Sequence, residues 1–256
     1  MNGNDIANFR PRAADLMTAL GLLTRLPIPL AAFPTDRARS AAHAAWAYPL
    51  VGLVVALLSA LAGWLALSLD LPPAAAALFV LMAGIASTGA MHEDGLADCA
   101  DGFWGGWTRE RRLEIMKDSQ IGTYGMVALV LGLGFRWVAI AALLTSGGYL
   151  MALVCAAVLS RAAMVAVMYA LPPARPSGLS GTTGRPPKLA MATAVILGII
   201  AACLFLPSAL TPALIAVLGV ALVARAKIGG QTGDVLGATQ QITEIAVLLT
   251  VLATLP

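Results

Sequence analysis

The sequence predicts an all-α polytopic membrane protein, and three observations support this fold class. Of the 256 residues, 59% are hydrophobic and 11% are charged, whereas average soluble domains have about 45–50% apolar and about 25% charged residues. Apolar runs of the length that a bilayer requires, about 20 residues, recur along the chain. The basic residues are concentrated in alternate connections between these runs. Too few polar side chains remain to cover a water-soluble globule, and 3 cysteines are too few for a disulfide-stapled domain.

The apolar runs predict about seven transmembrane helices. They cover approximately Trp46–Leu69, Ala74–Met91, Met126–Thr145, Tyr149–Leu171, Leu189–Leu206, Ala209–Ala224 and Val235–Leu255. The apolar segment before them, residues 13–32, is interrupted by charges and prolines, so we expect an interfacial or re-entrant helix there; an eighth span is the alternative. We expect one integral membrane domain over residues 1–256, with a flexible tail at 1–12 and a cytosolic active-site hairpin of helices at 92–124.

The distribution of basic residues predicts the orientation in the membrane. All of the 16 Lys and Arg residues except Arg136 and Arg161 precede the first span or lie in every second connection after it. The positive-inside rule places this side in the cytoplasm. We therefore expect the N-terminus inside and the C-terminus outside. Because the basic residues lie in these short connections, the net charge of +3 does not indicate a nucleic-acid partner.

The strongest candidate for chemistry is the segment HEDGLADCADG at residues 92–102, at the cytoplasmic end of the second predicted span. Asp94, Asp98 and Asp101 are spaced i, i+4, i+7, which places them within about 60° of each other on a helix. Three carboxylates on one stripe repel each other, and Mg²⁺, which binds carboxylate and phosphate oxygens, removes that repulsion. The pattern predicts a Mg²⁺ site; a solvated acidic face is the alternative.

Glycines at positions 102, 105 and 106 end this helix, and a second one is predicted at 109–118, RERRLEIMKD. Glu114 and Asp118 are spaced i, i+4, and Arg111 and Lys117 flank them. If this helix folds back, it adds carboxylates to the metal site and cations for a phosphate. Salt bridges within the helix, such as Glu114 with Lys117, are the alternative.

Two glycine-rich turns, residues 122–125 and 229–234, each precede an apolar run. The free backbone N–H groups of a helix N-terminus favour an anion, and Gln231, Thr232 and Asp234 add polar side chains to the second turn. A simple loop is the alternative for either turn. Residues 172–188 are expected to form a flexible cytosolic linker, with a lid as the alternative.

Three charged residues lie well inside predicted spans, where a charge costs about 2.5–3.5 kcal/mol on insertion scales. We expect Arg136 and Glu244 to form a structural ion pair, and Arg161 to reach a phosphate. His43 and His92 are expected to be polar boundary residues rather than ligands.

Taken together, these motifs resemble the cobalamin synthase (adenosylcobinamide-GDP ribazoletransferase) family. The resemblance rests on the acidic segment at 92–102, on LEIMKDS at 113–119 with GTYG at 122–125, and on GQTGDVLG at 230–237. TRLPIP at 24–29, YPLVG at 48–52 and the pair Ser160 and Arg161 fit the same pattern. The resemblance extends over about residues 16–250.

The resemblance implies a Mg²⁺-dependent phosphotransfer at the bacterial cytoplasmic (inner) membrane. A hydroxyl of α-ribazole, or of its 5′-phosphate, would attack the cobinamide-linked phosphate of adenosylcobinamide-GDP. GMP would leave, and adenosylcobalamin or its 5′-phosphate would form. Such a displacement needs charge neutralisation and alignment more than a covalent nucleophile, and the clustered carboxylates and cations supply both.

Roles for individual residues follow as hypotheses. The expected metal ligands are Asp94, Asp98, Asp101 and Glu114; the expected catalytic residues are Asp118, Asp234, Lys117 and Glu114, with Asp118 or Asp234 as general base; the expected substrate-binding residues are Arg161, Arg111, Gln231, Thr232 and Lys117.

Two other functions fit parts of the pattern. The acids at 98, 101, 114 and 118 resemble the motif of CDP-alcohol lipid phosphotransferases, although other residues of that motif are missing. A divalent-cation transporter also uses acidic residues, but the cluster is predicted at the cytoplasmic mouth rather than at the bilayer midplane. The expected partners are the two small-molecule substrates and membrane lipid; a homo-oligomer stays open.

Overall fold

The computed structural model describes residues 10–29, 40–176 and 178–254, and over these residues the secondary structure is helical apart from one isolated bridge between Pro173 and Gln231. The helices are α1 (Ala13–Leu23), η2 (Ala41–Ala47), α2 (Tyr48–Ser68), α3 (Pro73–Thr88), α4 (Met91–Gly105), α5 (Arg109–Ile115), α6 (Thr123–Ser146), α7 (Tyr149–Ala170), α8 (Leu179–Thr183), α9 (Lys188–Phe205), η3 (Pro207–Ala209), α10 (Leu210–Ile228) and α11 (Gly233–Thr254).

The predicted membrane architecture is confirmed. In the described part of the chain, 6 helical segments are long and apolar enough to cross a membrane, or up to 7 if the bent pair α3 and α4 counts as one span. Helix α1 has 11 residues, a length of roughly 16 Å at about 1.5 Å per residue. That is too short to span a bilayer, which favours the interfacial helix over an eighth span. Residues 1–9 of the expected tail and 30–32 lie outside the described residues.

The second predicted span differs from the expected one because the chain turns sharply after Thr88. Gly89 and Ala90 both have left-handed backbone conformations, with φ of 66° and 58°, and the axes of α3 and α4 differ by 87°. The segment that follows α1 stabilises this turn, because the backbone N–H of Arg25 donates a hydrogen bond to the carbonyl of Ser87 at 2.7 Å. The polar helix α4 therefore does not continue the direction of α3.

Helix α7 is the centre of the bundle and packs against α2, α9 and α11. Small residues permit these close approaches, as in other membrane bundles. A Cβ at Gly198 of α9 would lie 2.6 Å from the Cβ of Ala162 on α7. Most large exposed side chains are apolar and lie on the outer helices, among them Trp64, Phe79, Val130, Leu214 and Leu222, which is the distribution expected of a lipid-facing surface.

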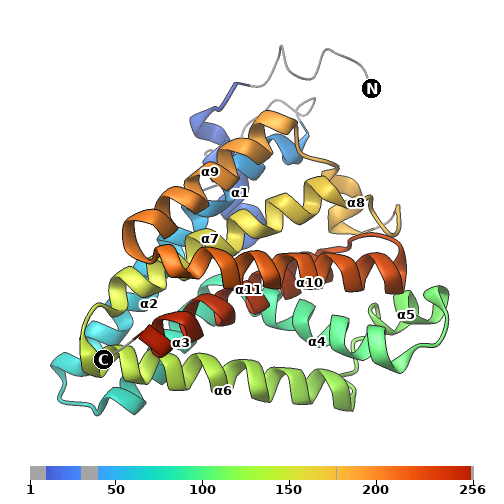
Figure 1. Ribbon diagram of the computed structural model, residues 1–256. Coiled ribbons are helices and arrows are strands. Elements are labelled where there is room, and N and C mark those ends of the chain that lie inside the picture. Colours follow the sequence, from blue (N-terminus) through green and yellow to red (C-terminus); the bar gives the residue numbers. More distant parts are fainter. Residues whose placement is uncertain (1–9, 30–39, 177, 255–256) are drawn as a thin grey trace.

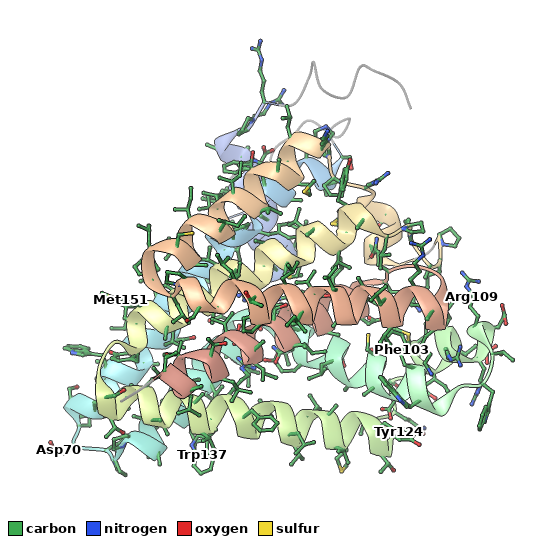
Figure 2. The ribbon with its side chains drawn as sticks, in the orientation of Figure 1. Asp70, Phe103, Arg109, Tyr124, Trp137 and Met151 are labelled. Carbon is green, nitrogen blue, oxygen red and sulfur yellow. The ribbon has the colours of Figure 1, made fainter. Side chains whose placement is uncertain are left out.

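The two ends of the bundle differ in composition (Figure 1). The connection between α2 and α3 lies at the same end as the C-terminus, whereas α5 and α8 lie at the other end. In Figure 2, Asp70 marks the first end and Arg109 the second. The basic connections and the acidic helix α4 are thus directed away from the end where the C-terminus lies, as the alternation of basic loops predicts.

Candidate active site

Helix α4 presents its acidic residues to two cavities at the end of the bundle opposite the C-terminus. The first cavity has a volume of about 460 Å³ and is lined by Asp94, Asp98, Lys117 and Asp118, among others. The second has about 160 Å³ and is lined by Asp94, Asp234 and Arg175, together with a large apolar wall. Asp94 lies between the two cavities and lines both.

The carboxylates near α4 are close enough to perturb each other. Asp98 is half-buried; this burial and the neighbouring carboxylates, above all that of Asp234, raise the pKa of Asp98 to about 7. Arg175 opposes this shift. The part of the shift that comes from the neighbouring carboxylates reflects repulsion between like charges, which a bound cation relieves.

Asp101 has a different surrounding from the other two acids on its stripe. Its Oδ2 accepts a hydrogen bond from the backbone N–H of Gly122 at 2.8 Å, and its Oδ1 accepts one from Gly125 at 2.9 Å. Any Cβ at either glycine would collide with this carboxylate. Asp101 therefore caps the N-terminus of α6, where a negative charge is also favoured by the helix dipole, and both of its oxygens are engaged by the protein.

The predicted hairpin forms, but only part of its second helix faces the acids. Helix α5 ends at Ile115, three residues earlier than expected, and Met116 packs against Gly102. This turn directs Lys117 and Asp118 into the first cavity. Glu114 instead pairs with Arg111 at 3.1 Å, and both side chains are about two-thirds exposed, at 65% and 64%.

The expectations for Glu114 and Arg111 are therefore corrected. Glu114 does not join the carboxylates of α4, and Arg111 does not line either cavity. The reason is local: α5 is too short to carry both turns of the predicted stripe toward the site. A salt bridge within the helix does form, but to Arg111 rather than to Lys117.

The start of α11 brings Asp234 to α4 through a close crossing of the two helices. A Cβ at Gly95 would lie 2.7 Å from the carbonyl oxygen of Asp234, and Gly237 lies against the backbone of His92 and Gly95. The carboxylate of Asp234 accepts a hydrogen bond from the Thr232 hydroxyl at 3.1 Å and pairs with Arg175 at 3.3 Å. Two glycines thus allow carboxylates of two helices to share one site.

Gln231 and Thr232 are buried and have structural partners. Ser180 donates to the Gln231 side chain, and the Gln231 backbone bonds to Pro172 and Ala174. The hydroxyl of Thr232 accepts a hydrogen bond from the N–H of Val235 at 3.3 Å, in the first turn of α11. Neither lines the two cavities at α4, but both line a small cavity of about 10 Å³ together with Arg175 and Ser180. This turn thus fixes Pro172, Ala174 and Ser180 against the start of α11, and the substrate contact expected of it stays a prediction.

Sequence reasoning missed Arg175, Ser180 and Thr183. All three line the second cavity and come from the segment that was expected to be a linker; its short helix α8 instead packs toward the site. The only feature of the sequence that pointed to this segment was a basic residue, Arg175, in a Pro-rich loop. The segment is held by Arg109, whose guanidinium donates to the carbonyl oxygens of Ile228 and Ala174 at 2.8 Å and 2.5 Å.

The charged residues inside the bundle form a separate cluster. Arg136 donates to Glu93 and to Glu244, each at 2.8 Å, which confirms the expected pair with Glu244 and adds a second acid. Arg161 lies beside them in a cavity of about 30 Å³, donating to the carbonyl of Ala157 on its own helix at 3.1 Å. The expectation that Arg161 reaches a phosphate is corrected, because its side chain is inside the bundle and lines neither cavity at the acids.

His92 also differs from expectation, since it is buried, with 2% of its surface exposed, rather than at a boundary. It lines the second cavity as well as the small cavity inside the bundle. Within residues 10–29, 40–176 and 178–254, neither ring nitrogen has a hydrogen-bond partner.

The donor set fits a metal that takes part of its ligands from substrate. Over the described residues, no three His, Cys, Asp or Glu side chains are grouped closely enough to hold a metal ion by themselves. Mg²⁺ commonly binds through one or two carboxylates, with waters and substrate phosphates completing its octahedron. Asp94 and Asp98, one helical turn apart on the wall of the first cavity, match that requirement.

The chain resembles known proteins over nearly its whole length. The family model described as Cobalamin-5-phosphate synthase matches residues 15–252. Proteins named adenosylcobinamide-GDP ribazoletransferase from Bradyrhizobium diazoefficiens, Sinorhizobium sp and Brucella canis are each 45% identical to it; the matches cover 92%, 91% and 92% of this chain and 92%, 94% and 95% of the relatives. No solved structure matches. This similarity extends over the acidic helix α4, the turn that carries Lys117, and the glycine crossing of α4 with α11. The chain therefore belongs to the cobalamin-5-phosphate synthase family.

Proposed function

We propose that this protein transfers adenosylcobinamide phosphate from adenosylcobinamide-GDP to α-ribazole or α-ribazole 5′-phosphate, with release of GMP. The observation that carries the proposal is the convergence of Asp94, Asp98, Lys117 and Asp118 on one cavity. This arrangement suits a diphosphate, and the relatives carry the name of this reaction. Asp94 also lines a second cavity of about 160 Å³.

The reaction requires alignment and charge compensation. The ribazole hydroxyl oxygen forms a bond to the cobinamide-linked phosphorus, and the anhydride bond to the GMP phosphate breaks, with its electron pair leaving on GMP. Lys117 holds the phosphate oxygens as charge develops on them. The hydroxyl proton passes to a carboxylate: Asp118 if the hydroxyl enters the first cavity, or Asp234 if it enters the second.

Mg²⁺ belongs to the proposal as the resident cation. When bound, it neutralises charge on the diphosphate and makes GMP a better leaving group. Asp94 and Asp98 would hold it together with oxygens of the donor. Asp101 and Glu114 are not included, because the first caps α6 and the second pairs with Arg111.

A donor comparison tests the reaction. The purified protein in detergent or nanodiscs is given adenosylcobinamide-GDP with α-ribazole, or a CDP-activated alcohol donor with a lipid acceptor. Release of GMP that depends on ribazole, with no release of CMP, is expected. Release of CMP alone would instead assign the lipid phosphotransferase reaction. Flux of a divalent cation into liposomes, in the absence of any GMP release, would assign a transporter.

We also propose that the site faces the cytosol of a bacterial cell, in the inner membrane, with the N-terminus inside. The basic connections near α4 support this orientation through the positive-inside rule. A C-terminal alkaline phosphatase fusion is expected to be active, because that enzyme folds only outside the cytoplasm, whereas a green fluorescent protein fusion at the same position stays dark. The reverse result contradicts the orientation.

A further inference from the structure

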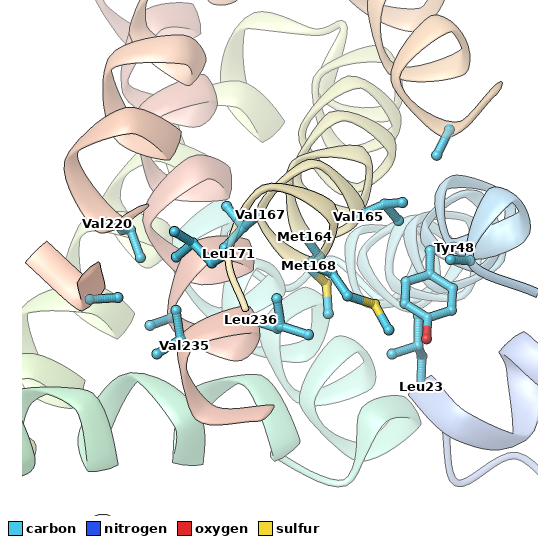
Figure 3. Close-up of a cluster of buried hydrophobic side chains, with 14 of the residues drawn as sticks. Leu23, Tyr48, Met164, Val165, Val167, Met168, Leu171, Val220, Val235 and Leu236 are labelled. Carbon is cyan, nitrogen blue, oxygen red and sulfur yellow. The ribbon is translucent and has the colours of Figure 1, made fainter. Parts of the chain in front are cut away.

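The second cavity has walls of two kinds. Leu23, Tyr48, Met164, Met168 and Leu236 form an apolar wall contributed by α1, α2, α7 and α11. Figure 3 shows these five side chains gathered around one another, with Met168 between the ring of Tyr48 and the side chain of Leu236. The other lining residues include carboxylates and hydroxyls from α4, α8 and the start of α11, and the guanidinium of Arg175. A ligand that matches both kinds of residue has an apolar body and polar groups at one end.

We propose that this cavity holds the base of the ribazole acceptor, with its ribose directed toward Asp94 and Asp234. The inference rests on the proposed function and goes beyond it by separating the two substrates. The donor's diphosphate then lies in the first cavity, beside Lys117. Asp94, which lines both cavities, marks the boundary where the acceptor hydroxyl meets the phosphate.

The size of the cavity supports an aromatic base. A closed protein cavity of roughly 150 Å³ is enough to admit benzene, and this one has about 160 Å³. A fused bicyclic ring fills it if the ribose extends out to the polar lining residues. The corrin macrocycle of the donor is far too large to enter.

The chemistry of the wall distinguishes the two bases in the reaction. Guanine carries several donors and acceptors on its edges, and burying them against Met and Leu side chains leaves them unpaired, which costs about 1–3 kcal/mol for each group. A benzimidazole linked to ribose carries only one ring-nitrogen acceptor and no donor, so far fewer groups are left unpaired. The thioethers of Met164 and Met168 suit its ring, because methionine sulfur makes favourable contacts with aromatic rings.

The test enlarges the base and the cavity in turn. With the wild-type protein, a ribazole analogue that carries one further fused ring is expected to show a KM at least tenfold higher than ribazole. Met168→Ala opens the wall and is expected to reverse this preference. The KM for adenosylcobinamide-GDP stays within twofold in both cases. The control is Met151→Ala, the same substitution on the same helix at an exposed position near its other end (Figure 2), which is expected to change neither KM.

The outcomes separate the two proposals. If the wild-type protein releases no GMP with ribazole, the proposed function fails. If it does, but accepts the larger analogue as well as ribazole, the assignment of the cavity is overturned, and this comparison needs no variant. A rise in the donor KM alone with Met168→Ala would place guanine in the cavity and would also overturn the inference.

Discussion

At the scale of single residues, three carboxylates on one helical stripe have three different environments. Asp101 is used by the backbone of α6, Asp98 has a raised pKa among its acidic neighbours, and Asp94 lies between two cavities. The spacing that suggested a single metal site therefore describes a stripe of which only the first two members, Asp94 and Asp98, line a cavity.

Asp101→Asn is expected to lower stability rather than metal affinity. The Asn side chain keeps one oxygen that accepts from one glycine N–H, but its NH₂ group then faces the N–H of the second glycine. The negative charge at the helix N-terminus is also lost. We expect about 1–2 kcal/mol of destabilisation, the range of a lost cap, measured by thermal unfolding in detergent. Asp118→Asn, at an exposed position, serves as the control and should lower turnover with unchanged stability. An unchanged melting temperature for Asp101→Asn together with a higher Mg²⁺ requirement would restore Asp101 as a ligand.

The raised pKa of Asp98 predicts how the Mg²⁺ requirement depends on pH. The carboxyl is neutral below about pH 7 and ionised above it, and a neutral carboxyl is a poor ligand. The Mg²⁺ concentration for half-maximal activity is therefore expected to rise as pH falls through 7, by about tenfold per unit at the steepest. Asp98→Asn should need more Mg²⁺ throughout and lose this dependence. A requirement that stays constant between pH 6 and 8 in the wild type contradicts the role of Asp98.

At the scale of elements, the crossing of α4 and α11 is what creates the site. Gly95 and Gly237 bring the two backbones together, and the carboxylates of Asp94 and Asp234 reach the same cavity as a result. Helix α5 contributes by ending early, which turns Lys117 and Asp118 toward α4. Helices α4 and α11 are far apart along the chain, whereas α4 and α5 are consecutive and form the hairpin.

Gly95→Ala is expected to reduce turnover by more than tenfold. Its Cβ would lie 2.7 Å from a backbone oxygen of Asp234 and 3.0 Å from its Cα, and backbone atoms of a packed helix are unable to move aside cheaply. The helices must separate, which displaces the carboxylates from each other. Gly134→Ala and Gly219→Ala are matched controls in other helices, because no atom lies within 4 Å of their Cβ positions. Wild-type turnover in Gly95→Ala would show that the crossing does not position the acids.

At the scale of the whole molecule, a buried ionic cluster joins the acidic helix α4 to the membrane bundle. Arg136 of α6 contacts Glu93 of α4 and Glu244 of α11, and Gln241 donates to Glu93 at 3.0 Å. Glu93 is adjacent to Asp94, so the cluster fixes the start of α4 from inside the bundle. The cluster and the glycine crossing hold α4 to the same helix, α11, by different means.

Arg136→Met is expected to destabilise the protein by about 3–5 kcal/mol, because it removes the ion pairs of Glu93 and Glu244 and leaves Arg161, among the described residues, as the one cation beside these two acids. The measurement is the fraction of folded protein during thermal or denaturant unfolding in detergent. Arg225→Met, at an exposed position near the end of α10, is the control and should cost much less. If Glu244→Gln is added to Arg136→Met, much of the stability should return, because one acid, Glu93, and one cation, Arg161, then remain in the cluster. Equal stability of Arg136→Met and the wild type would contradict a structural role.

The sequence by itself determined the membrane architecture, the alternation of its basic loops and the acidic helix, because each depends on composition or on helical periodicity that adjacent residues fix. It also indicated the pair of Arg136 with Glu244, because a charge inside a span requires a partner. Only the tertiary structure decided that α3 and α4 meet at 87°, that Asp101 caps α6, that Arg161 points into the bundle, and that Arg175 and His92 line a cavity. These facts depend on backbones that are distant in sequence and close in space. The role of a side chain at such a contact depends on which groups of the neighbouring helix it meets, and a local sequence pattern does not contain that information.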